Sequence, residues 1–188
     1  MPWRMNWSSR AAELSGGDAL VISIPKSGRT WVRAFLSAYY CARYEHPFTL
    51  DPPKTLDPRI PRIIYSHDLF EHRTKGRWWD KVRGKYLVPA RELRRAKVLF
   101  LVRDLRDAFV SHYVQLSRPS ADAPDQLKKM TASDMLRDPL LGIGQIVQTM
   151  NDWLGEFRDR PNVVLVRYED LQKEPASNFA RVLEAVGE

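Results

Sequence analysis

Short apolar runs occur along the chain, each bounded by polar or turn-forming residues. Runs rich in valine, isoleucine and leucine are typical of strands that are buried on both faces. The predicted strands cover residues 19–24, 62–66, 97–102 and 162–167. The third run, Lys-Val-Leu-Phe-Leu-Val, gives the clearest signal of the four.

Between these runs, apolar residues recur every three or four positions, which is the spacing of one helix face. Trp31, Phe35, Leu36 and Tyr39 predict a helix soon after the first strand. Asp104 is a suitable N-cap for a helix after the third strand. We expect that helix to bury Leu105, Phe109, Val110, Tyr113 and Leu116. We expect a longer helix, roughly Gly144–Arg158, to bury Ile146, Val147, Met150, Trp153, Leu154 and Phe157.

Strands that alternate with helices predict an α/β fold with a parallel sheet and helices on both of its faces. A last helix, with Pro175 in its first turn, completes the alternation. At 188 residues the chain has the length of a single domain, in which residues 1–17 are expected to form a flexible N-terminal segment. Ligands of such folds bind at the carboxyl ends of the strands, so functional residues are expected there.

Composition narrows the class of partner and of site. The formal charge of +7 indicates an anionic partner, and charge alone fits a nucleotide, a nucleic acid or an acidic polysaccharide equally well. A single cysteine, Cys41, excludes a disulfide framework and a cysteine-based zinc site. The sequence has no apolar run of signal-peptide or membrane-span length, so we expect a cytoplasmic protein with no membrane partner.

The residues after the first strand form a pattern that binds anions. The sequence Pro25-Lys-Ser-Gly-Arg-Thr-Trp31 reads as a tight turn that opens a helix. Backbone N–H groups at such a junction point toward an anion, and the helix dipole adds a positive potential. Lys26 contributes a charge, and Ser27 and Thr30 contribute hydroxyl donors. The pattern predicts a phosphate site, with an ordinary turn and a solvated lysine as the alternative.

This loop differs from the Walker A sequence of P-loop kinases. That motif needs two glycines separated by four residues and followed by Lys-Ser/Thr, whereas here Lys26 precedes the only glycine of the loop, Gly28. No aspartate suited to hold Mg²⁺ stands out at the end of an apolar strand. A P-loop nucleotide kinase is therefore the second choice of enzyme, although its fold would look similar.

Three later strand ends carry further candidates. Arg103 ends the third strand and Ser111 lies eight residues later, so an arginine fork and a hydroxyl are both available to a phosphate. Tyr168 follows the fourth strand in the sequence Tyr-Glu-Asp. His67 follows the second strand, and because a histidine titrates at about pH 6.5 it is a candidate general base.

The base has rivals nearby in the sequence. Asp68, Glu71 and His72 follow His67 within a few residues and could take a proton in its place. A lone histidine is also common as a structural residue, and the position of His67 between two anion-binding loops is what favours the catalytic interpretation.

Together these motifs resemble the cytosolic-type sulfotransferases, which use 3′-phosphoadenosine 5′-phosphosulfate (PAPS) as sulfuryl donor. The likeness extends over about residues 18–186 and implies a P-loop-like three-layer fold. By position it implies that the 5′-phosphosulfate is held by Lys26, Ser27, Gly28, Arg29 and Thr30. It implies further that Trp31 and Tyr168 contact the adenine and that Arg103 and Ser111 bind the 3′-phosphate.

The resemblance also implies a reaction. Lys26 would neutralise charge on the bridging oxygen as 3′,5′-ADP leaves, and His67 would take the proton of an acceptor hydroxyl or amine. No metal is required, and the sequence shows no cluster of metal ligands. The expected partner is a small-molecule or glycan acceptor rather than a nucleic acid.

The chain departs from the family pattern in three places. Arg29 stands where the family usually has threonine, and Tyr65 stands where the family's Lys-Thr-His has its lysine. The chain also stops at Glu188, before the family's basic Arg-Lys-Gly segment, so we expect the C-terminal part of the family domain to be missing. A truncated protein that binds a nucleotide or a nucleic acid without catalysis is therefore a third interpretation.

The acceptor is not readable from the sequence. Aromatic residues in the segment 70–90 could form an apolar wall around an acceptor or could equally belong to the core. These residues are Phe70, Trp78, Trp79 and Tyr86.

Overall fold

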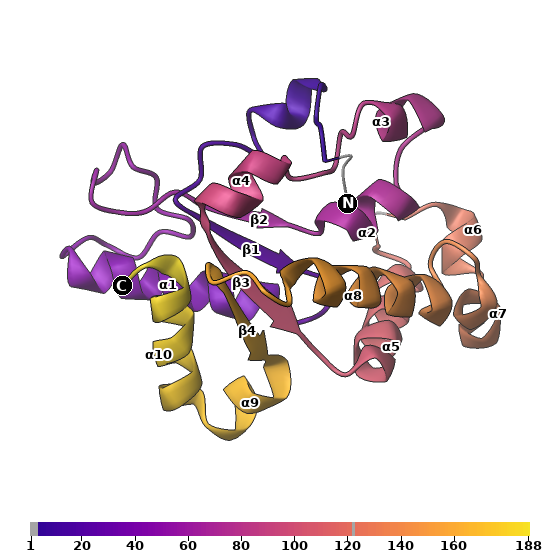
Figure 1. The fold of residues 1–188 in the computed structure, drawn as a ribbon. Helices are drawn as coiled ribbons and strands as arrows, with labels where there is room; N and C mark the ends of the chain where they lie inside the picture. The colour runs from indigo at the N-terminus through magenta and orange to yellow at the C-terminus, as the bar shows by residue number, and fades with distance from the viewer. Residues whose placement is uncertain (1–3, 122) are drawn as a thin grey trace.

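The computed structural model describes residues 4–121 and 123–188, and a four-stranded parallel sheet lies at its centre (Figure 1). The strands lie in the order β2-β1-β3-β4, and each neighbouring pair is parallel. Their bounds are β1 Ala19–Ser23, β2 Ile63–Ser66, β3 Lys97–Val102 and β4 Val163–Arg167. The four predicted strands are confirmed to within one residue at either end.

Helices cover both faces of the sheet, as the alternation of strands and helices predicts (Figure 1). Their bounds are α1 Arg29–Arg43, α2 Asp68–Thr74, α3 Trp78–Val82, α4 Ala90–Arg95, α5 Leu105–Leu116, α6 Asp125–Lys128, α7 Ala132–Arg137, α8 Ile143–Phe157, α9 Tyr168–Lys173 and α10 Pro175–Val186, with a 3₁₀ turn η1 at Ser9–Ala11. Helices α1 and α10 pack on one face, and α2, α4, α5 and α8 pack on the other.

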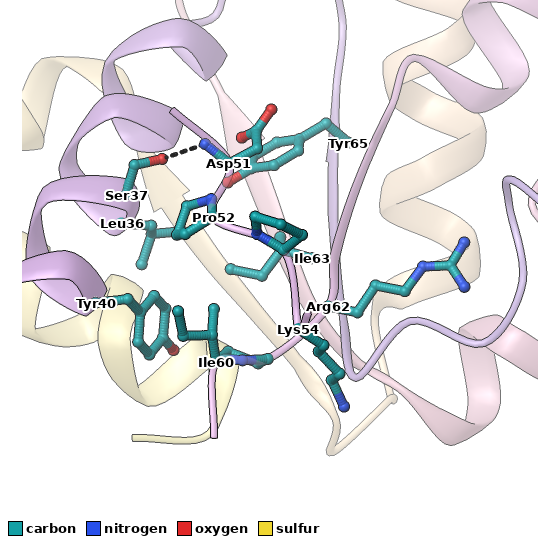
Figure 2. Close-up of a pocket in the computed structure, with 12 residues that line it drawn as sticks. Leu36, Ser37, Tyr40, Asp51, Pro52, Lys54, Ile60, Arg62, Ile63 and Tyr65 are labelled. Atoms are coloured by element: carbon teal, nitrogen blue, oxygen red, sulfur yellow. Dashed lines mark hydrogen bonds between the residues drawn. The ribbon is translucent and has the colours of Figure 1, made fainter. Parts of the chain in front are cut away.

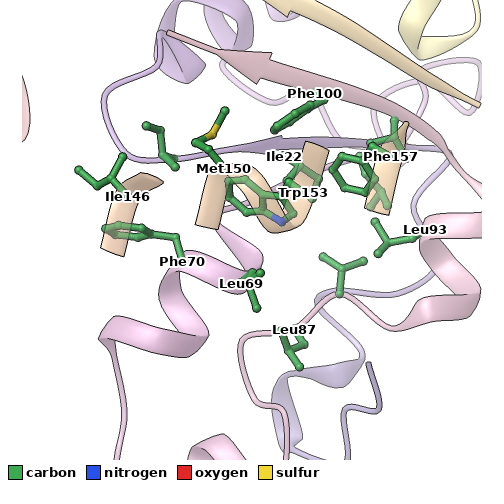
Figure 3. Close-up of a cluster of buried hydrophobic side chains, with 14 of the residues drawn as sticks. Ile22, Leu69, Phe70, Leu87, Leu93, Phe100, Ile146, Met150, Trp153 and Phe157 are labelled. Carbon is green, nitrogen blue, oxygen red and sulfur yellow. The ribbon is translucent and has the colours of Figure 1, made fainter. Parts of the chain in front are cut away.

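Aromatic side chains fill the core under α8. Trp153 and Phe157 meet Phe100 of β3 edge to face, with ring centroids 5.7 and 5.2 Å apart (Figure 3). Such pairs contribute about 0.5–1.5 kcal/mol each beyond their burial. Because Ile22 of β1 belongs to the same cluster, this core anchors the strand that leads into the anion-binding loop.

Three residues predicted to be buried are exposed instead. Val110, Val147 and Leu154 have 56%, 38% and 44% of their surface exposed. Each directly follows a buried residue, and an α-helix turns by about 100° per residue, so each points away from the core. The prediction for β4 also needs correction, because β4 is an edge strand in which Leu165 is 37% exposed.

Residues 4–17, for which we expected a flexible segment, make specific contacts with the domain. Arg4 is buried and pairs with Asp68 and Glu156. Leu14 is 3% exposed and belongs to the core on the α8 side of the sheet. The described part of this segment is therefore packed, and residues 1–3 lie outside the described residues.

The topology brings the predicted site residues that follow the strands to one edge of the sheet. The predicted anion-binding loop follows β1, His67 follows β2, Arg103 follows β3 and Tyr168 follows β4. Because all four strands are parallel, these positions share the carboxyl edge. In the part of the chain that the structure describes, no helix is long and apolar enough to cross a membrane.

Candidate functional site

The loop after β1 holds an unusual backbone conformation. Lys26 has φ +67° and Gly28 has φ +89°, and Gly28 is the N-cap of α1. A Cβ atom on Gly28 would lie 2.4 Å from Cδ2 of Tyr168, so a side chain there would be both strained and in collision. Glycine is required at this position because the loop must turn sharply and pass close to the Tyr168 ring.

A cavity of about 660 Å³ opens beside this loop, and we call it the ligand cavity. It joins nine of the predicted site residues, which come from all four strand ends. They are Lys26, Gly28, Arg29, Thr30, Trp31, His67, Arg103, Ser111 and Tyr168. Gln115 also lines it and was missed by the sequence analysis, although its position four residues after Ser111 places both on one helix face.

Ser27 is the predicted residue that does not line the ligand cavity. Its side chain is completely buried, and its hydroxyl has no hydrogen-bond partner among the described residues. The positive φ of Lys26 and Gly28 on either side reverses the chain at this point and turns the Ser27 side chain inward. The predicted contact of this hydroxyl with a phosphate is therefore not supported by the geometry.

Arg103 is held in place yet keeps donors for a ligand. Its Nη1 donates to the carbonyl oxygen of Lys26 at 2.9 Å, and its guanidinium lies 4.4 Å from the Tyr168 ring centroid. Its Nε is buried and has no partner in the described part of the chain. A fixed guanidinium with unused donors is suited to bind a phosphate group.

Trp31 and Tyr168 form an aromatic wall of the ligand cavity. Their rings meet edge to face at 6.0 Å, and Trp31 also meets Phe179 of α10 at 5.3 Å. Trp31 is 39% exposed, so it is not a core residue despite its place in the helical pattern. An exposed aromatic ring that lines a cavity can stack on a planar heterocycle.

The loops after β3 and β4 are tied together by a carboxylate. Oε1 of Glu169 accepts a hydrogen bond from the backbone N of Asp104 at 2.7 Å. Asp104 in turn caps α5 by accepting from the backbone N of Arg106 at 2.9 Å, as the sequence predicts. These contacts fix the strand end that carries Arg103 against the strand end that carries Tyr168.

His67 has the tautomer of a general base. Its Nδ1 lies 2.7 Å from the carbonyl oxygen of Ser23, and a carbonyl can only accept, so Nδ1 carries the proton. In the neutral ring Nε2 is then unprotonated and free to accept. Burial and the nearby charge of Arg29 lower the pKa of His67 from its ordinary value to about 4, which keeps the ring neutral.

The structure separates His67 from two of its three rivals. Asp68 is fully buried and accepts from Arg4, from Nε1 of Trp153 at 3.1 Å and from the backbone N of Val88 at 2.8 Å. His72 lines a different cavity, beside Arg4. Both residues are therefore unavailable to a ligand that lies beside His67.

A second cavity, of about 570 Å³, adjoins the ligand cavity, and we call it the adjoining cavity. The two share Pro25, His67 and Gln115, so His67 lies at their boundary. Its apolar lining includes Phe70, Leu116, Leu127, Leu140 and Leu141. This cavity offers room for an apolar molecule within reach of the proposed base.

The adjoining cavity also holds two further titratable groups. Glu71, the third rival, lines it and pairs with Nζ of Lys75 at 2.8 Å. His112 lines it as well, and its buried Nδ1 has no partner among the described residues. The sequence analysis missed His112, although its place next to Ser111 in the predicted helix was a usable signal.

The other expected aromatic residues lie outside both cavities. Trp78 and Trp79 are 61% and 55% exposed, so the interpretation of these two as core residues is wrong. Neither they nor Tyr86 line the ligand cavity or the adjoining cavity. Within residues 4–121 and 123–188, no group of three or more His, Cys, Asp or Glu side chains is placed to hold a metal ion.

Comparison with known proteins gives a consistent result. The sequence profile of the family described as the sulfotransferase domain matches residues 17–188. Cytosolic sulfotransferase 7 of Arabidopsis thaliana is 24% identical in an alignment that covers 93% of this chain and 57% of that protein. Flavonol 4′-sulfotransferase of Flaveria chlorifolia is 25% identical, over 90% of this chain and 55% of that protein.

A solved structure shows the same fold. The crystal structure of mouse sulfotransferase SULT7A1 complexed with PAP matches with a TM-score of 0.56 at 17% identity, over 97% of this chain and 64% of that chain. The match confirms the predicted three-layer α/β fold. The chain spans little more than half the length of the two plant relatives described above.

Proposed function

Because the chain belongs to the sulfotransferase domain family, we propose that it transfers a sulfuryl group from PAPS to a small-molecule acceptor and releases 3′,5′-ADP (PAP). The observation that carries this proposal is that the loop after β1, Arg103 and the unprotonated nitrogen of His67 meet in one cavity. A kinase is disfavoured because the loop has no Gly-Lys-Ser/Thr sequence.

The residues of the ligand cavity fit a nucleotide with two phosphate groups. Lys26, Thr30, Arg103 and Ser111 all line the cavity, and we expect the loop to hold one phosphate and Arg103 with Ser111 to hold the other. Arg103 retains a buried donor that no described residue satisfies, which a phosphate oxygen would pair. The adenine would lie against Trp31 and Tyr168. The mouse sulfotransferase of similar fold was crystallised with PAP, which supports PAP as the kind of ligand that this cavity takes.

The adjoining cavity is the proposed acceptor site. Its apolar lining and its size suit a small molecule with one reactive hydroxyl or amine, rather than a chain of sugars. The relatives include enzymes named for a flavonol and for a 3-alpha-hydroxysteroid, which are acceptors of that kind. A cytosolic location is part of the proposal, because several relatives are named cytosolic sulfotransferases.

The reaction needs a base and a cation on opposite sides of sulfur. The acceptor oxygen forms a bond to sulfur while the bond from sulfur to the 5′-phosphate oxygen breaks, and its electron pair leaves with 3′,5′-ADP. His67 Nε2 takes the acceptor proton, since its Nδ1–H is engaged by Ser23. Lys26 lies in the loop beside the departing oxygen and neutralises the charge that develops there.

Ligand-dependent melting tests the proposal first. The proposal expects 3′,5′-ADP to raise the melting temperature, since binding at one hundred times Kd adds about 2.7 kcal/mol of stability. ATP with Mg²⁺ should have a smaller effect or none. A panel of phenolic, steroid and amine acceptors with PAPS then tests transfer. Stabilisation by ATP–Mg²⁺ but not by 3′,5′-ADP would favour the kinase, and no stabilisation by either would favour the non-catalytic interpretation.

A further inference from the structure

Arg29, the first residue of α1, lies between two cavities with its charge unpaired. It lines the ligand cavity with Lys26 and His67, and it lines a neighbouring cavity of about 480 Å³ with Arg33 and Tyr65. Its guanidinium makes no hydrogen bond or ion pair with the described residues. Burial lowers the pKa of Arg29, and the more distant Glu71 opposes this only in part. A guanidinium in this position is stabilised when an anion joins it.

The carboxylates around Arg29 already have partners. Asp51 pairs with Arg33, one turn further along α1. Glu71 pairs with Lys75 at 2.8 Å and lies 3.9 Å from Arg10. None of these groups is free to neutralise Arg29, so a bound anion would be its first close counterion.

Tyr65, near the end of β2, contributes no positive charge to the ligand cavity. Figure 2 shows Tyr65 beside Asp51, in a cavity of about 270 Å³ between α1 and the segment 51–63. Tyr65 does not line the ligand cavity, and burial raises the pKa of its phenol, so it stays neutral. Of the described residues, Lys26, Arg29 and Arg103 are the cations that line the ligand cavity.

Two of these three cations lie where they suit the phosphate groups of the nucleotide rather than its sulfonate. Lys26 lies in the turn itself, beside the proposed 5′-phosphate, and Arg103 lies at the end of β3, beside the proposed 3′-phosphate. Arg29 instead lies within electrostatic reach of His67, because its charge contributes to the low pKa of that ring. Arg29 and His67 both line the ligand cavity, so a sulfonate held beside the loop would have a cation and the proposed base within the same cavity.

We propose that the guanidinium of Arg29 binds the sulfonate oxygens of PAPS and stabilises their charge while sulfur passes from the 5′-phosphate to the acceptor. This inference rests on the proposed function. Arg29 neither gains nor loses a proton in the step, since the acceptor proton goes to His67 and the electron pair of the broken bond goes to 3′,5′-ADP. A guanidinium offers two parallel donors to two oxygens of one anion, which suits a sulfonate.

A binding experiment separates sulfonate recognition from nucleotide recognition. The dissociation constants of PAPS and 3′,5′-ADP are compared for the wild type and the variants Arg29→Gln and Arg29→Lys. Arg29→Gln should weaken PAPS binding about tenfold or more, which is the size expected for a lost charge-assisted contact, and should change 3′,5′-ADP binding much less. Arg29→Lys should keep part of the preference for PAPS. Arg33→Gln is the matched control, because Arg33 lies on the same helix and is already paired.

A second readout needs no ligand. NMR titration of the histidines follows the pKa of His67, whose surroundings also include Glu71, Lys75 and the Ser23 carbonyl. Arg29→Gln should raise this pKa toward its ordinary value because a nearby positive charge is removed. Arg33→Gln should leave it unchanged.

Each of three results would contradict the inference. An unchanged ratio of PAPS to 3′,5′-ADP affinity in Arg29→Gln, equal behaviour of the glutamine and lysine variants, or an unmoved His67 titration would each overturn the role of Arg29. If the wild type binds neither PAPS nor 3′,5′-ADP, the proposed function itself fails. If the wild type prefers PAPS and Arg29→Gln retains that preference, only the role of Arg29 fails.

Discussion

Arg4 is buried and Arg29 is partly buried, yet only Arg4 has carboxylate partners. Nη1 of Arg4 donates to both oxygens of Asp68 at 2.7 and 2.6 Å, and Nε and Nη2 donate to Glu156 at 2.9 and 2.6 Å. Burial alone would lower the pKa of Arg4, but the two carboxylates raise it. Arg29 has no such partners, and its pKa is lowered.

The difference distinguishes a structural ionic centre from a binding site. Around Arg4 every strong donor meets an acceptor, and Asp68 also accepts from Trp153 and Val88, so nothing is left for a ligand. Around Arg29 the donors exceed the acceptors, and Arg103 also keeps an unused Nε. A buried and a partly buried arginine in one domain thus have opposite consequences, which depend on whether the chain itself supplies the anion.

Breaking the Arg4 centre should give the largest effect. Asp68→Asn removes one charge and leaves Arg4 with one carboxylate, so unfolding should become easier by about 3–5 kcal/mol, as for other broken buried ion pairs. Urea unfolding measures this loss. If Asp68→Asn instead keeps its stability and loses turnover, Asp68 is the general base and the assignment of these two regions is wrong.

Removing the proposed base should have the next largest effect, on turnover alone. His67→Ala should reduce the transfer rate by about 10²–10⁴-fold, the usual contribution of a general base. Binding of 3′,5′-ADP should change little, because Nε2 is expected to face the acceptor. The matched control is His72→Ala, since His72 lies on the helix that directly follows His67 but lines a different cavity.

Variants of His112 and Glu71 make the test of the general base more specific. Both line the adjoining cavity and could accept a proton if His67 does not. An active His67→Ala protein combined with an inactive His112→Ala or Glu71→Gln protein would move the role of base to that residue.

Replacing Arg103 should have a smaller effect, confined to the discrimination between nucleotides with and without a 3′-phosphate. Arg103→Ala should reduce the preference for 3′,5′-ADP over 5′-AMP by about 1.5–3 kcal/mol, the value of a hydrogen bond to a charged group. Calorimetric titration with both nucleotides measures it. Arg106→Ala is the control, since Arg106 is exposed and pairs with Asp104. If wild type and Arg103→Ala prefer 3′,5′-ADP over 5′-AMP equally, Arg103 does not bind the 3′-phosphate.

The pH dependence should show the smallest shift. Because the pKa of His67 is lowered to about 4, its base form persists in the free protein well below the ordinary histidine range. The acidic limb of kcat/KM is therefore expected near pH 4–5 rather than near 6.5, where an ordinary histidine titrates. A limb near 6.5 would show that the ring is less buried, or further from Arg29, than the structure has it.

The same shift has a consequence for stability. The unfolded chain takes up a proton on this histidine at about pH 6.5, whereas the folded chain does so only near 4. The folded state is therefore favoured above pH 6.5, and this contribution declines as the pH falls from there to 4. Urea midpoints measured across that range in wild type and His67→Gln should converge at low pH.

The sequence by itself determined the strands, the order of strands and helices, and most of the candidate site. This was possible because the relevant signals are local. A strand is a short apolar run, and the anion-binding loop is seven consecutive residues, so neither depends on distant parts of the chain. His67, Arg103 and Tyr168 were predictable for the same reason, since each directly follows a strand and parallel strands share one edge.

The tertiary structure alone decided which polar groups are used up by the fold. Asp68 and His67 are neighbours in sequence, yet Asp68 is occupied by Arg4, which is 64 residues away, and His67 keeps a free nitrogen. Likewise the hydroxyl of Ser27 is buried, whereas the adjacent Lys26 and Gly28 line the ligand cavity. Pairing and burial depend on contacts between residues far apart in sequence, and the free energy of a buried charge depends on its partners rather than on its neighbours along the chain.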